Sequence, residues 1–255
     1  MRRALSRGEL TGDGCCVAET FHLLEEAIRS GRPVRAILAA ESVGAAVEPH
    51  VKGLRGTAVH VVPDELFQAV VSTESAQGVI ALVEPPAWTV EQLFRGRSLV
   101  VVLDGVQDPG NAGTVIRTAE AFGATGVMFL KGSVSPFNAK TLRASAGSLF
   151  RLPFLAALDA DVARAALRQR RVDVYAAEPR GAMPLEQADF TRKSALLVGS
   201  EAHGVSAAMR GCAVDVRIPT AGVESLNAAV AAGVILYEAA RQRMLAARDR
   251  TRELI

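Results

Sequence analysis

The sequence is poor in aromatic residues and has no long uninterrupted apolar run. Aromatic residues make up 5% of the 255 residues, so stacking platforms for single-stranded nucleic acid are scarce. No window reaches ~18 consecutive apolar residues, which argues against a membrane-spanning helix. The N-terminus lacks the apolar core of a secretory signal. We therefore expect a cytoplasmic protein without a membrane anchor.

Cysteine and histidine are also rare. The three cysteines are Cys15, Cys16 and Cys212, and the four histidines are scattered along the chain. No spacing among these residues matches a zinc site, and adjacent cysteines are not expected to pair with each other. We expect reduced, buried thiols and no bound metal.

Apolar residues are abundant and the charge is unevenly divided. Hydrophobic residues make up 49% of the chain, which is enough for a sizeable core. Residues 1–84 carry 8 Lys and Arg against 11 Asp and Glu, whereas residues 98–255 carry 19 against 15. The positive excess of the second part allows a polyanionic partner without demanding one.

The first 84 residues have the pattern of a small α/β unit, which ends in the stiff stretch Glu84-Pro85-Pro86-Ala87-Trp88. The pattern predicts helices over 16–30, 43–54 and 64–70, and strands over 34–39, 57–62 and 79–83. We therefore predict a domain over 1–84, a linker over 85–97 and a second domain over 98–255.

Short β-branched runs alternate with helical stretches in the second part. The runs lie at 99–103, 127–130, 172–176, 195–198 and 214–218, and the helices at 112–122, 159–169, 206–211 and 227–243. This alternation predicts a parallel, doubly wound sheet, whose ligands bind beyond the carboxyl ends of the strands. The loops expected there are 104–111, 131–147, 199–205 and 219–227.

The first candidate segment follows the strand predicted at 99–103. Asn111 lies where a helix cap belongs, and Arg117 follows on the same helix, from which its side chain can lean back toward the loop. Taken alone, these residues also fit a capped helix with a solvated arginine. No GxGxxG motif follows the strand, which disfavours a dinucleotide-dependent oxidoreductase.

Two further segments carry candidate residues. Gly199 directly follows a predicted buried strand and permits close approach of a ligand, while Glu201 and His203 lie in the same turn. An ordinary turn would have the same residues. Ser225 and Asn227 precede an Ala/Gly-rich helix that permits close packing, either within one subunit or against a partner.

Together the three segments resemble the motifs of the SpoU branch of the SPOUT methyltransferases. The matching residues are Asp108, Pro109, Asn111, Gly113, Arg117, Ala119, Phe122 and Gly123 in the first motif, Gly199, Glu201 and Gly204 in the second, and Ile218, Pro219, Gly222, Ser225, Leu226, Asn227, Val230 and Ala231 in the third. Residues 143–147 also resemble a family segment, and residues 19–38 with 77–79 more weakly resemble its L30e-like substrate-binding domain.

The resemblance implies a fold and a set of partners. It implies a parallel-sheet α/β domain with a deep trefoil knot, preceded by a small L30e-like domain that binds RNA. The cofactor would be S-adenosylmethionine, held by backbone groups at the positions of Gly199, Ile218 and Leu226. Members of the family are homodimers, with each active site completed across the interface.

The resemblance further implies transfer of a methyl group to a ribose 2′-hydroxyl of RNA, with 23S ribosomal RNA favoured as the target. It assigns catalytic roles to Arg117, Asn111, Glu201, Ser225 and Asn227. A guanidinium is effectively always protonated, so we expect Arg117 to act as an electrostatic clamp rather than as a base. The alternatives are a tRNA 2′-O-methyltransferase, a base methyltransferase of the same class, and an RNA-binding module without catalysis.

Overall fold

The computed structural model describes residue 4, residues 8–71 and residues 77–253. The chain divides into two compact units, a smaller one of residues 1–87 with 135–151 and a larger one of residues 88–134 with 152–255. The break after Ala87 lies inside the predicted linker of residues 85–97. Segment 135–151, however, packs with the N-terminal unit, although the sequence placed it in the second domain.

The smaller unit is built on a four-stranded sheet in the order β1-β4-β2-β3. The strands are β1 (Cys16–Glu19), β2 (Val34–Ala40), β3 (Ala58–Val62) and β4 (Val79–Val83). β4 pairs antiparallel with β1 and β2, whereas β2 and β3 are parallel. The helices are α2 (Phe21–Arg29), α3 (Gly44–Val51) and α4 (Asp64–Val70).

The helix predicted over residues 16–30 is wrong at its start. Residues 16–19 form strand β1, all four of them buried, and the helix begins only at Phe21. Thr20 separates the two elements with a φ of 150°, and its side chain accepts a hydrogen bond from the backbone of Leu23 at 3.2 Å. A short apolar run has no clear period, and here strand pairing with β4 overrides the helical pattern.

Two arginines fasten segment 135–151 within the smaller unit. Arg143 of α7 (Ala139–Ser145) forms an ion pair with the buried Glu19 of β1, and Arg151 forms one with the nearly buried Glu26 of α2. A buried carboxylate left unpaired is strongly unfavourable, so these arginines hold the segment firmly in place. The sequence predicted a loop over 131–147, and helix α7 was missed.

The larger unit has a seven-stranded sheet in the order β7-β6-β5-β10-β8-β11-β9. Its strands are β5 (Leu99–Asp104), β6 (Gly126–Leu130), β7 (Phe154–Leu158), β8 (Asp173–Ala177), β9 (Met183–Pro184), β10 (Ser194–Gly199) and β11 (Val214–Arg217). Every neighbouring pair is parallel. The predicted parallel sheet is therefore confirmed, while the knot implied by the resemblance stays a prediction.

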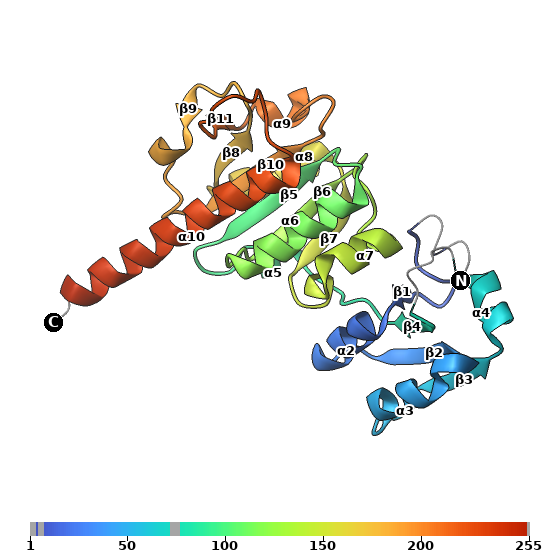
Figure 1. Cartoon of the computed structure of the whole chain (residues 1–255). Coiled ribbons are helices and arrows are strands. Elements are labelled where there is room, and N and C mark those ends of the chain that lie inside the picture. The colour runs from blue at the N-terminus through green and yellow to red at the C-terminus, as the bar shows by residue number, and fades with distance from the viewer. Residues whose placement is uncertain (1–3, 5–7, 72–76, 254–255) are drawn as a thin grey trace. The chain divides into compact units, whose positions relative to one another are not determined.

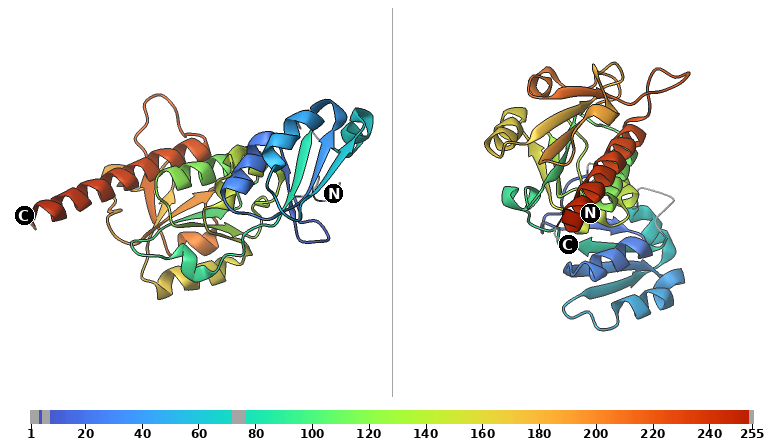
Figure 2. Two further views of the ribbon diagram at one scale, coloured as in Figure 1. Left: turned by 90° about the horizontal axis from the view of Figure 1, so that it is seen from below. Right: turned by 90° about the vertical axis from the view of Figure 1, so that its left-hand side faces the viewer.

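Helices cover both faces of this sheet (Figures 1 and 2). α6 (Pro109–Ala121) and α10 (Ala228–Glu253) lie side by side on one face. α5 (Val90–Leu93), α8 (Ala160–Gln169) and α9 (Ala207–Arg210) cover the other, where Leu167 and Met209 join a core with buried strand residues. Residues of β5 and β10 are buried on both faces, as expected for central parallel strands.

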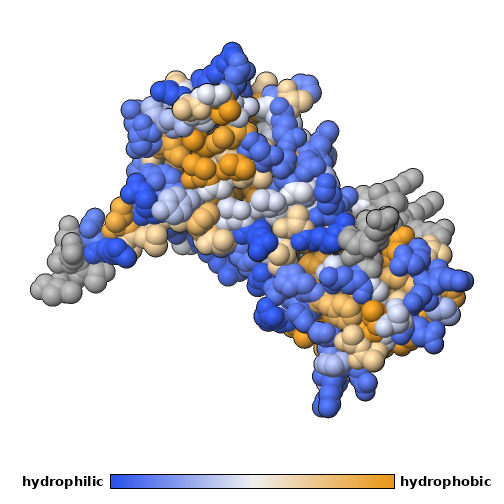
Figure 3. Space-filling view, in the orientation of Figure 1, coloured by the Kyte–Doolittle hydropathy of each residue, from blue (hydrophilic) through white to orange (hydrophobic). Residues whose placement is uncertain are grey.

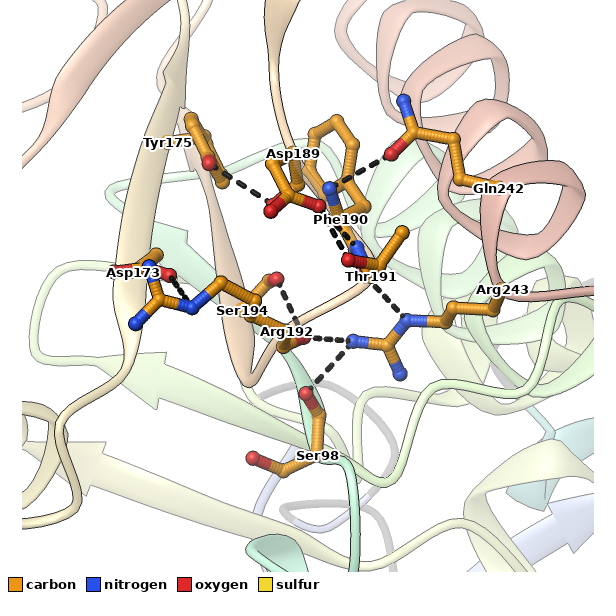
Figure 4. Close-up of polar contacts among 10 residues, drawn as sticks. All are labelled: Ser98, Asp173, Tyr175, Asp189, Phe190, Thr191, Arg192, Ser194, Gln242 and Arg243. Carbon is orange, nitrogen blue, oxygen red and sulfur yellow. Dashed lines mark hydrogen bonds and ion pairs between the residues drawn. The ribbon is translucent and has the colours of Figure 1, made fainter. Parts of the chain in front are cut away.

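Arg243 anchors the middle of α10 to the amino-terminal edge of the sheet (Figure 4). Its guanidinium donates hydrogen bonds to the carbonyl oxygens of Arg97, Ser98, Phe190 and Arg192, at 2.7 to 2.9 Å. Burial lowers the pKa of this guanidinium from its ordinary value. Helix α10 is thus fixed where β5 and β10 begin.

Candidate active site

A cavity of about 510 Å³ lies at the carboxyl ends of β8, β10 and β11. Figure 3 shows apolar side chains gathered over these strands beside the first turns of α10. The cavity is lined by Ala177, Glu178, Pro179, Val198, Gly199, Ser200, Glu201, His203, Gly204, Val216, Ile218, Thr220, Glu224, Ser225, Leu226, Asn227, Ala228, Ala231 and Ile235. Six of the eight predicted site residues are among them, brought together from two separate segments.

Gly199 lets two parts of the cavity wall meet. A Cβ atom at this position would overlap the backbone of Gly204 and Val205. Residues 200–204 fold back as a tight turn, with Ser200 N donating to Gly204 O at 3.1 Å and Gly204 N to Ser200 O at 2.8 Å. Glycine is therefore required at residue 199 by close backbone approach rather than by an unusual φ.

Three predicted polar residues form one hydrogen-bonded chain at the edge of the cavity. Asn111 donates its amide N–H to Glu201, and Asn227 donates to Asn111 Oδ1 at 3.1 Å. Asn227 Oδ1 also accepts a hydrogen bond from the backbone N–H of Ala229 at 2.9 Å and so caps the start of α10. The network joins the first, second and third candidate segments through side chains alone.

Asn111 does not cap α6, contrary to the prediction. The cap is Asp108, whose carboxylate accepts a hydrogen bond from Asn111 N at 2.7 Å. Pro109 then occupies the first helical position, where its fixed φ suits the helix and its missing N–H is not needed. Because Asp108 caps the helix, the side chain of Asn111 remains available for Glu201 and Asn227.

Asn111 and Arg117 are the two predicted site residues outside the cavity lining, and Arg117 does not join the hydrogen-bonded chain either. It is exposed on α6 and is not among the lining residues. Within the described part of the chain, it forms no hydrogen bond or ion pair. Its guanidinium is therefore available to a partner outside this chain.

Two acidic residues at strand ends were missed by the sequence analysis. Asp104, the last residue of β5, is buried and accepts a hydrogen bond from Ser206 N at 2.7 Å. Glu178 directly follows β8 and lines the cavity. The rule that ligands bind beyond strand ends applies to the loop after residues 172–176 as well, and would have pointed to Glu178.

Among the residues that the structure describes, no group of three His, Cys, Asp or Glu side chains is arranged to hold a metal ion. In the same residues, no helix has both the length and the apolar character needed to cross a bilayer.

Comparison with known families accounts for both parts of the sequence. Residues 98–237, more than half of the chain, match the SpoU rRNA Methylase family. The chain belongs to this family. Residues 20–89 match the model described as RNA 2′-O ribose methyltransferase substrate binding, so this SpoU family member also has the accessory domain.

Individual relatives match this SpoU family member over most of its length. The 23S rRNA (guanosine(2553)-2′-O)-methyltransferase RlmP of Bacillus subtilis is 34% identical over 235 residues, 91% of each chain. The 23S rRNA (uridine(2479)-2′-O)-methyltransferase of Streptomyces viridochromogenes is 33% identical and covers 86% of this chain and 79% of its own. The crystal structure of the SpoU methyltransferase AviRb from the same species, in complex with AdoMet, has a TM-score of 0.85 at 31% identity, covering 95% and 96% of the two chains.

Proposed function

We propose that this chain transfers a methyl group from S-adenosylmethionine to a ribose 2′-hydroxyl of 23S ribosomal RNA. The observation that carries the proposal is the convergence of segments 199–204 and 218–228 on one cavity, with Asn111 bonded to residues of both. Relatives that match most of the chain are named for this reaction, and a structural relative was crystallised with the cofactor.

The cavity fits S-adenosylmethionine in size and chemistry. Its volume of about 510 Å³ falls within the range of pockets that enclose ligands of this size. Val216, Ile218 and Ile235 offer an apolar wall to the adenine, and nearby carboxylates such as Glu201 suit a cationic ligand. The backbone groups of Gly199, Ile218 and Leu226 would hold the cofactor. When bound, it supplies a methyl group already activated by a positively charged sulfur.

The protein must then align the ribose and manage one proton. Enforced alignment of two reactants can contribute ~7–11 kcal/mol to lowering a barrier. The Glu201–Asn111–Asn227 chain offers a fixed row of polar groups for orienting the ribose, and Ser225 also lines the cavity. We assign these residues to positioning of the ribose and of the methyl donor.

Arg117 is assigned to charge stabilisation. A guanidinium is a fixed cation with several N–H donors. That of Arg117 therefore stabilises the alkoxide that develops on the ribose, and it also binds a neighbouring phosphate. Since Arg117 is exposed on α6 and does not line the cavity of its own chain, we propose that it serves the cavity of a second copy.

A homodimer through α6 and α10 would supply that second copy. Val230, Val234 and Tyr237 form an apolar stripe on α10 and are exposed by 54%, 37% and 56%. Their spacing places them on one helix face. α10 packs closely on α6, which carries Arg117, as the edge-to-face contact of Tyr237 with Phe122 indicates. The exposed apolar stripe supports a dimer interface that includes α6, the helix that carries Arg117.

Mixing two inactive variants tests the shared site. Arg117→Ala keeps its cavity, and Gly199→Ala keeps its arginine. If each site combines two chains, unfolding and refolding an equal mixture restores about a quarter of the wild-type rate, because half the dimers are mixed and each has one intact site. No recovery in a mixture shown to contain mixed dimers would contradict the shared site.

Light scattering tests the interface itself. Val234→Glu is expected to give monomers, because it places a charge in the apolar stripe. Val162→Glu is the matched control, since Val162 is 56% exposed on α8, on the other face of the sheet. If Val234→Glu stays dimeric, the interface lies elsewhere.

Nucleoside analysis tests the reaction. Ribosomal RNA lacking the modification is incubated with the chain and S-adenosylmethionine carrying a labelled methyl group, and the digested nucleosides are separated by mass. We expect label in a 2′-O-methylated nucleoside. Label on a base identifies a base methyltransferase, label only in tRNA identifies a tRNA enzyme, and RNA binding without transfer identifies a silent module. Each of these results would contradict the proposal.

A further inference from the structure

Glu178 lies beside the predicted cofactor-binding glycine, although no motif includes it. β8 and β10 are adjacent and parallel, with Ala176 opposite Leu197. Continuing this register by two residues brings Glu178 next to Gly199. Both residues line the cavity. A carboxylate at the carboxyl end of a strand, beside a ligand-binding glycine, occupies the position from which dinucleotide-binding folds contact a ribose hydroxyl.

The carboxylate of Glu178 is held in place from three directions. Its Oε1 atom forms an ion pair with Arg210 and accepts a hydrogen bond from Val205 N at 3.3 Å. Its own backbone N–H donates to Val216 O at 2.9 Å. A Cβ atom added at Gly204 would lie 3.0 Å from Oε1, so the turn packs directly against the carboxylate. The side chain is only 15% exposed, whereas that of Arg210 is 45% exposed.

These contacts also set the charge of the site. The hydrogen bond with Glu178 raises the pKa of Arg210, which therefore remains a cation. Because the charge of the Glu178 carboxylate is already balanced by Arg210, the site does not favour a second cation. It still has acceptor capacity, because each carboxylate oxygen has two lone pairs and Oε1 makes both of the contacts described. A neutral donor with two adjacent O–H groups suits such a carboxylate.

We propose that Glu178 is a cofactor-binding residue that accepts hydrogen bonds from the ribose hydroxyls of the methyl donor. This inference rests on the proposed function, which supplies the identity of the cofactor. It adds a side-chain contact to a site for which the family motifs imply backbone contacts alone. The ribose contact makes Glu178 the residue that distinguishes a ribonucleoside from a deoxyribonucleoside in this cavity.

A purely structural role for Glu178 predicts a different result. If Glu178 only fixed the 200–204 turn through Val205, its loss would weaken all ligands of the cavity by the same factor. If it contacts the ribose, its loss weakens ligands that carry the hydroxyls and has little further effect on ligands that lack them. The ratio of the two affinities therefore separates the roles, as in a double-mutant cycle.

Calorimetric titration with S-adenosylhomocysteine and its 2′-deoxy and 3′-deoxy analogues measures this ratio. In the wild-type chain we expect removal of a contacted hydroxyl to weaken binding about 10- to 100-fold, as for hydrogen bonds to charged groups. In Glu178→Ala the ratio falls to within about threefold of one, and in Glu178→Gln it falls only part of the way, because a neutral amide oxygen accepts more weakly than a carboxylate. Glu224→Gln is the control, because Glu224 lines the same cavity and loses the same charge.

Thermal melts without ligand show whether each variant folds, and the isosteric Glu178→Gln serves if Glu178→Ala does not. If Glu178→Gln still discriminates between S-adenosylhomocysteine and its deoxy analogues as strongly as the wild type does, the inference is overturned. It is also overturned if Glu224→Gln loses this discrimination and Glu178→Gln keeps it. A wild-type chain that binds S-adenosylhomocysteine equally well with or without the hydroxyls would also overturn it. If the wild-type chain does not bind S-adenosylhomocysteine, the proposed function fails rather than the assignment of Glu178 alone.

Discussion

Replacing Gly199 with alanine is expected to unfold part of the cavity wall. The added Cβ would lie under 3.0 Å from Gly204 C, Val205 N and Gly204 O, which are backbone atoms and cannot rotate away. Overpacking of this kind costs about 1–3 kcal/mol, and the two hydrogen bonds of the 200–204 turn contribute about 1 kcal/mol each. We expect the free energy of unfolding to fall by about 3–5 kcal/mol. Affinity for S-adenosylhomocysteine should fall at least tenfold, because Gly199 and the displaced turn form part of the cavity wall.

Urea denaturation followed by circular dichroism measures the first quantity, and calorimetric titration the second. Gly211→Ala is the matched control. Gly211 has a φ of −62°, and an added Cβ would meet its nearest atom, Ala207 O, at 4.0 Å. The free energy of unfolding of this variant should lie within about 1 kcal/mol of the wild-type value. If Gly199→Ala matches Gly211→Ala in both stability and ligand affinity, the argument from close backbone approach is wrong.

Three further variants test other parts of the account. Arg243→Ala leaves four carbonyl groups without their donor and should lower the free energy of unfolding, measured in urea titrations, by about 3 kcal/mol. The control Arg241→Ala breaks only an exposed pair with Glu238 and should lower it by less than about 1 kcal/mol. Equal losses would refute the anchoring role. Arg117→Lys should lower turnover about 10²–10³-fold, as Arg117→Ala does, because a point charge cannot reproduce the guanidinium fork. The affinity of both Arg117 variants for S-adenosylhomocysteine should not change. A variant that loses this affinity but keeps its turnover would contradict the assignment. A hydrogen bond from Arg241 lowers the pKa of Glu238 below its ordinary value of 4.5. The charged pair therefore stabilises the fold above about pH 4.5, and this stabilisation is lost as the pH falls through the lowered pKa. Melting temperatures should therefore fall less steeply on acidification in Glu238→Gln, and a parallel fall in both chains would refute this contribution.

The larger unit was predictable because its strands have an unambiguous pattern. The run at residues 99–103 is apolar at every position, and it forms a central strand buried on both faces. β7 was missed because it is an edge strand with exposed positions, so residues 154–158 lack a continuous buried run. The start of α2 was misplaced for a related reason, since four buried residues fit a strand as well as a helical turn.

The site was predictable where a motif named it and only partly where geometry had to be inferred. Gly199, Ile218 and Leu226 were assigned to one site by resemblance, and all three line the cavity. The cap assignment of Asn111 failed because Asp108 and Pro109 form a better helix start, a local competition that spacing alone does not settle. Glu178 was missed because the loop after the strand predicted at 172–176 was left out of the candidate loops, although the strand-end rule covers it, and the pairing of β8 with β10 then places it beside Gly199.

The proposed service of Arg117 to the cavity of a second copy would link turnover to dimer formation. A cavity in one chain that depends on an arginine of another is active only when the dimer forms. Its turnover should therefore depend on protein concentration near the dissociation constant of the dimer. Binding of S-adenosylhomocysteine, which uses residues of one cavity, should vary much less with protein concentration.

The most direct test of the central claim is a crystal structure of the chain with S-adenosylhomocysteine. We expect the ligand in the cavity at the carboxyl ends of β8, β10 and β11, in contact with Gly199, Ile218 and Leu226. Arg117 of a second copy should lie at the mouth of the same cavity. A ligand bound elsewhere, or a cavity whose mouth is closed to any second copy, would contradict the account.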